Sequence, residues 1–252
     1  MSRKTPPSAV ARQLRQEAGC GCAVCGNPLV AYHHIIEWSE RQHFEPEHMV
    51  ALCPNHHAEY GKLAKSKSYS AKKNPINLKN GRIKGYLGGH KAQKRLRIGG
   101  MTIGDCKSAI SYSGISLFSY RLIDGEYSLN SFLPAPDFWP EIEIKENAVS
   151  AWTEDFWDIE FKTNWIKFRR AKGEIFLSID FRGDNVEIDG NLELLGESLK
   201  FGKDETQIGT GTFSNIHIES CGIGLGLGPR GRLLPPNYAM AIPKLKHLPF
   251  HP

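Results

Sequence analysis

The chain has 252 residues, of which 40% are hydrophobic, and its formal net charge is +5. This length supports one large domain or two modest ones with a hydrophobic core. No apolar run approaches the roughly eighteen residues of a membrane-spanning helix, and no apolar segment follows the basic residues near Met1. We therefore expect a cytoplasmic protein with neither a membrane span nor a secretory signal.

The first predicted elements are a helix and then two strands followed by a second helix. Ser8 is a suitable N-cap for a helix over residues 9–18, in which Val10 and Leu14 are one turn apart and face inward. The next elements are expected in the order strand, loop, strand end and helix, over residues 29–36, 38–47 and 48–63. This order is a ββα unit.

Two pairs of metal-ligating residues flank the predicted strands. Cys22 and Cys25 have the spacing CxxC, and Cys53 and His56 have the spacing CxxH. Zn²⁺ prefers four soft or borderline ligands in a tetrahedron, so two such pairs predict a closed structural zinc site. Cys20 is an alternative to Cys22, but the usual two intervening residues favour Cys22. Clustered cysteines beside a histidine, in a chain without a predicted signal, favour a metal over disulfide bonds.

Four more histidines lie close to these pairs, namely His33, His34, His48 and His57. A lone histidine is usually a packing residue, but a cluster beside a metal site favours a functional role. An imidazole can ligate a metal, and it can deprotonate water near neutral pH. Hydrolysis of a phosphate ester needs such a base, and it needs a cation to neutralise the developing charge.

Three separated segments resemble, in order, the motifs of the HNH endonucleases. They are Cys22-Ala-Val-Cys25, Tyr32-His-His-Ile-Ile36 and Glu47-His-Met-Val-Ala-Leu-Cys-Pro-Asn-His-His57. The resemblance covers residues 10–63, about a fifth of the chain. It implies a zinc-stapled ββα-metal fold and hydrolysis of phosphodiester bonds.

The resemblance also implies a role for each histidine. His34 would be the general base, and His33 and His57 would bind a catalytic Mg²⁺ or Mn²⁺ ion. His48 stands where the family has an asparagine that orients the base or braces the loop, and is the second predicted catalytic residue. Gly61 stands where some members have a further metal ligand, so water and phosphate would complete the coordination of this ion.

A basic segment follows the predicted nuclease module. Residues 62–97 contain twelve Lys and Arg residues and no Asp or Glu, which indicates a surface that binds a polyanion. The alternative is a solvated basic linker. The predicted nucleic-acid-binding residues are Lys62, Lys65, Lys67, Lys72, Lys73, Arg82, Lys84, Lys94, Arg95 and Arg97.

From Met101 onward the pattern is typical of short strands separated by turns. Strands are expected over residues 115–123, 126–133, 141–152, 158–168, 174–181, 185–195 and 207–219, and Asp189-Gly190 is one of the turn signals. These strands predict an antiparallel sandwich or barrel, with a β-helix as the alternative. Asp158 and Glu160 are interpreted as outward-facing strand residues. Cys106 and Cys221 are isolated in the sequence. The Pro-rich tail from Pro229 is expected to be irregular.

The predicted fold class is therefore α+β, in three parts. Residues 1–63 form the HNH nuclease module, residues 64–100 a basic connector, and residues 101–252 a β-rich domain for recognition, oligomerisation or a protein partner. The predicted function is metal-dependent cleavage of DNA, expected to be double-stranded, in phage defence or a mobile element. The alternatives are a non-catalytic zinc-knuckle protein that binds nucleic acid, and a nuclease that acts on RNA under control of the β domain.

Overall fold

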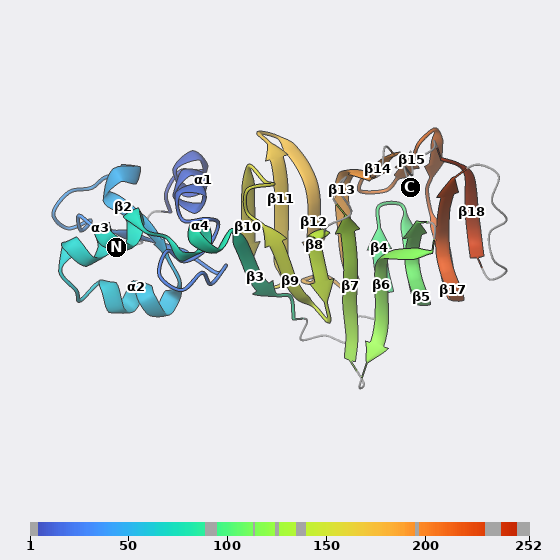
Figure 1. Cartoon of the computed structure of the whole chain (residues 1–252), viewed down its shortest axis with the longest axis horizontal. Helices are drawn as coiled ribbons and strands as arrows, with labels where there is room; N and C mark the ends of the chain where they lie inside the picture. The colour runs from blue at the N-terminus through green and yellow to red at the C-terminus, as the bar shows by residue number, and fades with distance from the viewer. Residues whose placement is uncertain are drawn as a thin grey trace, which may run out of the picture. The chain divides into compact units, whose positions relative to one another are not determined.

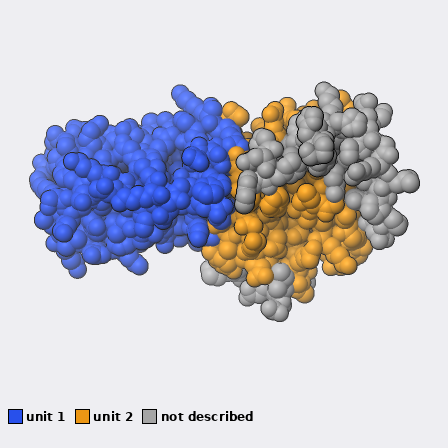
Figure 2. Space-filling model, viewed as in Figure 1, with its two compact units in different colours: residues 1–85, 150–173 blue, residues 86–149, 174–252 orange. Residues whose placement is uncertain are grey.

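The computed structural model describes residues 5–88, 95–112, 114–123, 126–134, 140–194, 197–229 and 238–245. Strands make up 52% of the structure and helices 17%, so the protein is mostly β rather than an even mixture of the two. The chain folds into two compact units, shown in Figure 2. Unit 1 comprises residues 1–85 and 150–173, and unit 2 comprises residues 86–149 and 174–252. The segment 150–173 thus belongs with the N-terminal part of the chain.

Unit 1 contains the helices and a small two-stranded sheet. Its elements up to residue 80 are α1 (Ser8–Glu17), β1 (Ala31–His34), a 3₁₀ turn η1 (Pro46–His48), β2 (Met49–Leu52), α2 (Pro54–Tyr60), α3 (Lys65–Lys73) and α4 (Ile76–Asn80). The strand, strand and helix therefore lie where the sequence predicts them. The first helix begins one residue earlier than expected, with Pro7 at the cap position and no side-chain cap. None of the helices that the structure describes has both the length and the apolar character needed to cross a membrane.

In the small sheet, β2 is the buried strand. β1 and β2 are antiparallel, with His33 opposite Val50 and His34 opposite Met49. All four residues of β2 are buried, and Val50, Ala51 and Leu52 pack with Cys22 and Ile35 in one hydrophobic cluster. Leu14 of α1 is also buried, as expected for an inward-facing position, whereas Val10 is only partly buried. This packing places α2 directly after a rigid strand.

A buried ion pair connects α1 to a later hairpin of unit 1, built from β10 (Asp158–Lys162) and β11 (Trp165–Ala171). Asp158 accepts two hydrogen bonds from Arg15, at 2.9 and 2.8 Å, and a third from Arg169 at 2.9 Å. The sequence interpretation of Asp158 as an outward-facing residue is wrong, because its exposure is 1%. An alternating strand pattern cannot reveal this, since the residue that neutralises Asp158 lies 143 positions earlier.

Unit 2 is built from a curled sheet. Its strands include β4 (Arg95–Ile98), β5 (Met101–Tyr112), β6 (Ile115–Ile123), β7 (Glu126–Pro134), β8 (Pro140–Lys145), β12 (Glu174–Asp180), β13 (Val186–Leu194), β14 (Glu197–Phe201), β15 (Thr206–Ile208), β16 (Gly211–Phe213), β17 (Ile216–Pro229) and β18 (Tyr238–Leu245). The hydrogen-bonded order of its central strands is β12-β13-β4-β5-β6-β7-β8. Figure 1 labels these strands. Most neighbours are antiparallel, but β17 runs parallel to both β5 and β18, and β13 runs parallel to β4.

Several strand boundaries differ from those predicted. The segment 141–152 is two strands, β8 and β9 (Ala148–Trp152), because Glu146 and Asn147 adopt a positive φ and turn the chain. Asp189-Gly190 lies inside β13 and is not a turn; at Gly190 a Cβ would lie 2.3 Å from the carbonyl oxygen of Phe176. The tail contains a strand, β18, that pairs with β17. The predicted basic connector contains α3, α4, β3 (Arg82–Tyr86) and β4.

Candidate metal centre and histidine site

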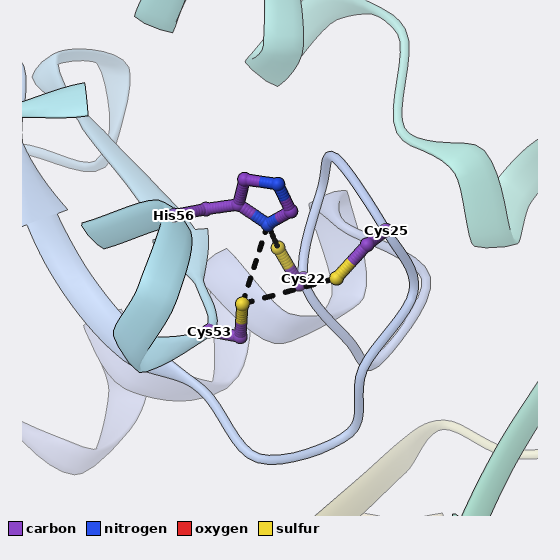
Figure 3. Close-up of side chains that lie close together, drawn as sticks. All are labelled: Cys22, Cys25, Cys53 and His56. Carbon is purple, nitrogen blue, oxygen red and sulfur yellow. Dashed lines mark hydrogen bonds between the residues drawn. The ribbon is translucent and has the colours of Figure 1, made fainter. Parts of the chain in front are cut away.

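The two predicted ligand pairs meet in unit 1 (Figure 3). Cys22 and Cys25 lie in the loop after α1, Cys53 occupies the cap position of α2, and His56 lies in the first turn of that helix. The four ligand atoms lie within 4.8 Å of one another. Among the residues that the structure describes, one group of three or more Cys, His, Asp or Glu side chains could hold a metal ion, and it is this cluster.

The distances in this cluster fit a tetrahedral zinc ion. The Sγ atoms of Cys25 and Cys53 are 3.8 Å apart, and Nδ1 of His56 lies 3.5 Å from Sγ of Cys22 and 3.3 Å from Sγ of Cys53. With Zn–S near 2.3 Å and Zn–N near 2.05 Å, a tetrahedron has S–S edges of about 3.8 Å and S–N edges of about 3.6 Å. The donor set and its spacing are therefore those of a structural zinc site.

Cys20 is excluded as the alternative ligand by its position. It is 4% exposed, adopts φ +62°, and lies outside the cluster of ligand atoms. Burial raises the pKa of the Cys20 thiol to about 12 and that of the Cys25 thiol to about 11, so the position of the sulfur atom, and not its pKa, separates Cys20 from the ligands. Burial alone would raise the pKa of the Cys53 thiol. Hydrogen bonds from the backbone at the start of α2 and from Cys25 outweigh burial and lower this pKa below its ordinary value.

The loop that carries Cys22 and Cys25 is held by a residue that sequence reasoning missed. Asn77 of α4 donates from Nδ2 to the carbonyl oxygens of Gly19 and Gly26, at 3.1 and 3.2 Å. Gly26 has φ +77°, and a Cβ there would meet the Asn77 side chain at 2.3 Å. No sequence signal identifies Asn77, because it lies in the basic segment 51 residues after Gly26.

The imidazole rings of His33 and His57 are in contact beside the Cys₃His cluster. Their rings are perpendicular, with centroids 5.1 Å apart. His33 comes from β1 and is 9% exposed, whereas His57 is half-buried in the first turn of α2, immediately after the zinc-type ligand His56. A separation of 5.1 Å between perpendicular rings is that of an edge-to-face contact, so β1 and α2 each bring one imidazole to the same place.

His34 lies among a different set of residues. As the neighbour of His33 on a strand, it projects toward the opposite face. Its ring packs on Trp38, His43 and Phe44, with centroids 5.4, 5.2 and 5.9 Å away. Its Nε2 donates to the carbonyl oxygen of His43 at 3.0 Å. A neutral imidazole that donates from Nε2 carries its lone pair on Nδ1, so this bond selects the tautomer.

The ring of His43 fixes the loop that supplies this carbonyl oxygen. His43 is 7% exposed; its Nε2 donates to the carbonyl oxygen of Ile36 at 3.0 Å, and its Nδ1 accepts from the backbone N–H of Glu45 at 3.2 Å. The sequence analysis did not single out this residue.

His48 contacts this loop rather than the rings of His33 and His57. Nδ1 of His48 lies 2.8 Å from the hydroxyl of Tyr69 in α3, and its ring packs on His43 with centroids 6.0 Å apart. Its Nε2 lies 3.8 Å from a carboxylate oxygen of Glu45. His48 therefore joins α3 to the loop that contains His43 and Glu45.

The basic residues predicted to bind nucleic acid are divided between the two units, with those up to Lys84 in unit 1 and those from Lys94 onward in unit 2. Several pair with acidic side chains within their own unit: Lys65 with Glu40, Lys72 with Glu17, Arg95 with Glu219, and Arg97 with Glu187 and Asp204. Arg82 lies over the ring of Trp152 at 4.2 Å. Lys62, Lys67, Lys73 and Lys84 are exposed, and Lys94 lies outside the described residues.

No protein-family model, no curated protein and no solved structure matches this chain. The family resemblance therefore depends on the residues of unit 1 and on their geometry. What the structure supports directly is a Cys₃His cluster that can hold a zinc ion.

Proposed function

We propose that unit 1 is a metal-dependent endonuclease of the HNH type. The observation that carries this proposal is the contact between His33 and His57, whose ring centroids are 5.1 Å apart on a strand and a helix beside the Cys₃His cluster. A zinc ion held by the Cys₃His cluster would tie the Cys22 loop to the start of α2, and so would fix the position of His57. Its role would be structural and not catalytic.

His33 and His57 would hold the catalytic cation, which when bound would neutralise charge on the phosphate and on the leaving 3′-oxygen. Water and phosphate oxygens would supply its remaining ligands. Imidazole is a better ligand for later first-row metals than for Mg²⁺. We therefore expect Mn²⁺, Co²⁺ or Ni²⁺ to support a higher rate than Mg²⁺ at equal concentration.

His34 accepts the proton of the attacking water on Nδ1, because its Nε2 proton is donated to the carbonyl oxygen of His43. In an in-line displacement the attacking and leaving oxygens lie on opposite sides of phosphorus. The base and the metal therefore flank the phosphate rather than contact each other. Adjacent residues that leave a strand in opposite directions, as His33 and His34 do, suit this requirement.

The substrate class is nucleic acid, and we propose double-stranded DNA. The exposed lysines at the end of α2 and along α3, Lys62, Lys67 and Lys73, supply phosphate contacts without base recognition. Tyr69 connects α3 to the histidine loop through its contact with His48. We also propose that unit 2 binds a partner protein or a second copy of the chain, and that the protein acts in phage defence or a mobile element.

The test is a nicking assay on supercoiled plasmid, with labelled RNA duplex as a parallel substrate. We expect nicking with Mn²⁺, none with EDTA, and loss of at least 100-fold in His33→Ala and His57→Ala with zinc content unchanged. His217→Ala is the matched control, because His217 is exposed in unit 2. Tight, metal-independent DNA binding without cleavage would favour the non-catalytic alternative, and cleavage of RNA alone would overturn the choice of DNA.

A further inference from the structure

Cys106 and Cys221, which are 115 residues apart in sequence, are direct neighbours in unit 2. They lie on the parallel strands β5 and β17, where Cys106 is in register with Cys221. Registered neighbours in a parallel pair are separated by the strand spacing of about 4.8 Å, and their side chains leave the sheet on the same face. The thiol of Cys106 donates to the carbonyl oxygen of Gly104 at 3.4 Å. A disulfide bond requires a Cα–Cα separation of roughly 4.4–6.8 Å, and the strand spacing of about 4.8 Å lies within this range.

Both strands bend immediately before the cysteines. Asp105 has φ +48° and Ser220 has φ +55°, and the hydroxyl of Ser220 donates to a carboxylate oxygen of Asp105 at 3.4 Å. A positive φ in a residue other than glycine is uncommon within a strand. Because the two bends coincide, the register is kept across them, and the cysteines remain opposite each other.

The pair is open to small molecules. A cavity of about 790 Å³ is lined by both cysteines, and also by Lys107, Arg121 and the stacked pair Tyr120 and Tyr127, among others. Cys106 is buried at 4% exposure, whereas Cys221 is half-buried. The two thiols thus differ in access, with Cys221 the more accessible sulfur.

We propose that Cys106 and Cys221 are a redox-active dithiol that a small peroxide, entering this cavity, converts into a disulfide bond across the two strands. This inference does not depend on the proposed nuclease function. Because Cys221 is the more accessible sulfur, it reacts with the peroxide first. Cys106 then attacks the oxidised sulfur of Cys221 to form the disulfide bond.

The reaction balances in two steps. The Cys221 thiolate attacks hydrogen peroxide, breaks the O–O bond and forms a sulfenic acid, and one water is released after proton transfer. The Cys106 sulfur then attacks the sulfenic sulfur, the S–S bond forms, and the hydroxyl leaves as a second water with the thiol proton. The two electrons lost by the thiols reduce one peroxide. Burial and the neighbouring Cys221 raise the pKa of the Cys106 thiol to about 12, which agrees with its low exposure in disfavouring Cys106 as the thiol that attacks the peroxide.

The test is peroxide treatment of the full-length, zinc-loaded protein, then alkylation of free thiols, trypsin digestion and mass spectrometry. The tryptic peptides Ile98–Lys107 and Asp204–Arg230 each contain one cysteine, so the readout is independent of the cysteines in unit 1. We expect these two peptides to appear linked after peroxide and separate after reduction. Recovery of both peptides with alkylated cysteines, or a link from either peptide to a different one, would overturn the proposal.

Two single variants test the order of attack with dimedone, which captures sulfenic acids. In Cys106→Ser, the sulfenic acid on Cys221 has no resolving thiol, and we expect the Asp204–Arg230 peptide to carry dimedone. In Cys221→Ser, we expect Cys106 to be recovered alkylated, without dimedone. Capture on Cys106 instead would reverse the assigned roles. The wild-type link is measured without any variant, and circular dichroism checks that each variant is folded.

Discussion

The imidazole of His34 donates from Nε2 to the backbone carbonyl oxygen of His43, nine residues later and 3.0 Å away. This bond selects the tautomer of His34, and it orients the ring within the group formed by Trp38, His43 and Phe44. The carbonyl oxygen is held in turn by the His43 ring, which bonds to backbone groups at both ends of the same loop. The bond therefore favours the tautomer of neutral His34 in which Nδ1 carries the lone pair that accepts a proton.

We expect His34→Ala to lower the nicking rate by about 100- to 10,000-fold, the usual range for loss of a general base. Zinc content and the unfolding midpoint should remain close to those of the wild type, because His34 is only partly buried and lies outside the Cys₃His cluster. Added imidazole should restore part of the activity. Undiminished nicking by His34→Ala would end the assignment of this residue as the base.

Cys53→Ala should remove the bound zinc and the cooperative unfolding of unit 1, since a structural zinc site contributes directly to folding. The matched control is Cys20→Ala, which also removes a buried cysteine near the cluster but not a ligand. Metal content by mass spectrometry should give one zinc per chain for the wild type and Cys20→Ala, and none for Cys53→Ala. Equal loss in both variants would show that general packing, and not coordination, explains the effect.

The buried pair of Arg15 and Asp158 should show an asymmetric response to mutation. Asp158→Asn leaves the charges of Arg15 and Arg169 without their shared partner, and we expect it to cost about 3–5 kcal/mol of unfolding free energy. Arg15→Met should cost less, about 1–3 kcal/mol, because Asp158 keeps its bond from Arg169. Urea unfolding of the two variants measures the difference. A larger loss in Arg15→Met would show that packing of Arg15 dominates over charge.

The free energy of unfolding should fall in acid partly through Glu160. Burial alone would raise the pKa of Glu160, but the hydrogen bonds from Lys162 and Arg169 and the charge of Arg15 outweigh it and lower the pKa. A carboxyl whose pKa is lower in the folded state stabilises the fold above its unfolded pKa, and this contribution is lost as pH falls through the folded value. The difference in stability between wild type and Glu160→Gln should therefore shrink as pH falls below about 4.5. A constant difference across that range would contradict this.

Charge reversal on α3 should weaken DNA binding without changing its sequence preference. Replacing Lys67 and Lys73 with glutamate removes two phosphate contacts, so the slope of log affinity against log salt should become shallower by about 2. The matched control reverses Lys200 and Lys203, which are exposed in unit 2. Fluorescence anisotropy at several salt concentrations gives both slopes. An equal change in both variants would indicate a nonspecific effect of net charge.

The sequence by itself determined the ligand set of the metal centre and the elements that carry it. Metal coordination restricts residue types and short-range spacing, so the pairs CxxC and CxxH, and the strand, strand and helix between and after them, could be predicted locally. The choice of Cys22 over Cys20 also followed from spacing, and the ligand-atom distances agree with it. The strand-rich character of the later chain was predicted in the same way, from alternation and turn residues.

Only the tertiary structure decided which distant residues meet. The ion pair of Arg15 and Asp158, the bonds from Asn77 to the Cys22 loop, and the register of Cys106 with Cys221 each join positions more than fifty residues apart. Strand alternation fixes which face a side chain occupies, but not which strand lies beside it. The sequence places His33 and His34 on opposite sides of one strand, but it could not give the neighbours that each ring contacts, or pair the basic residues with acidic ones, because both outcomes depend on packing of the whole unit.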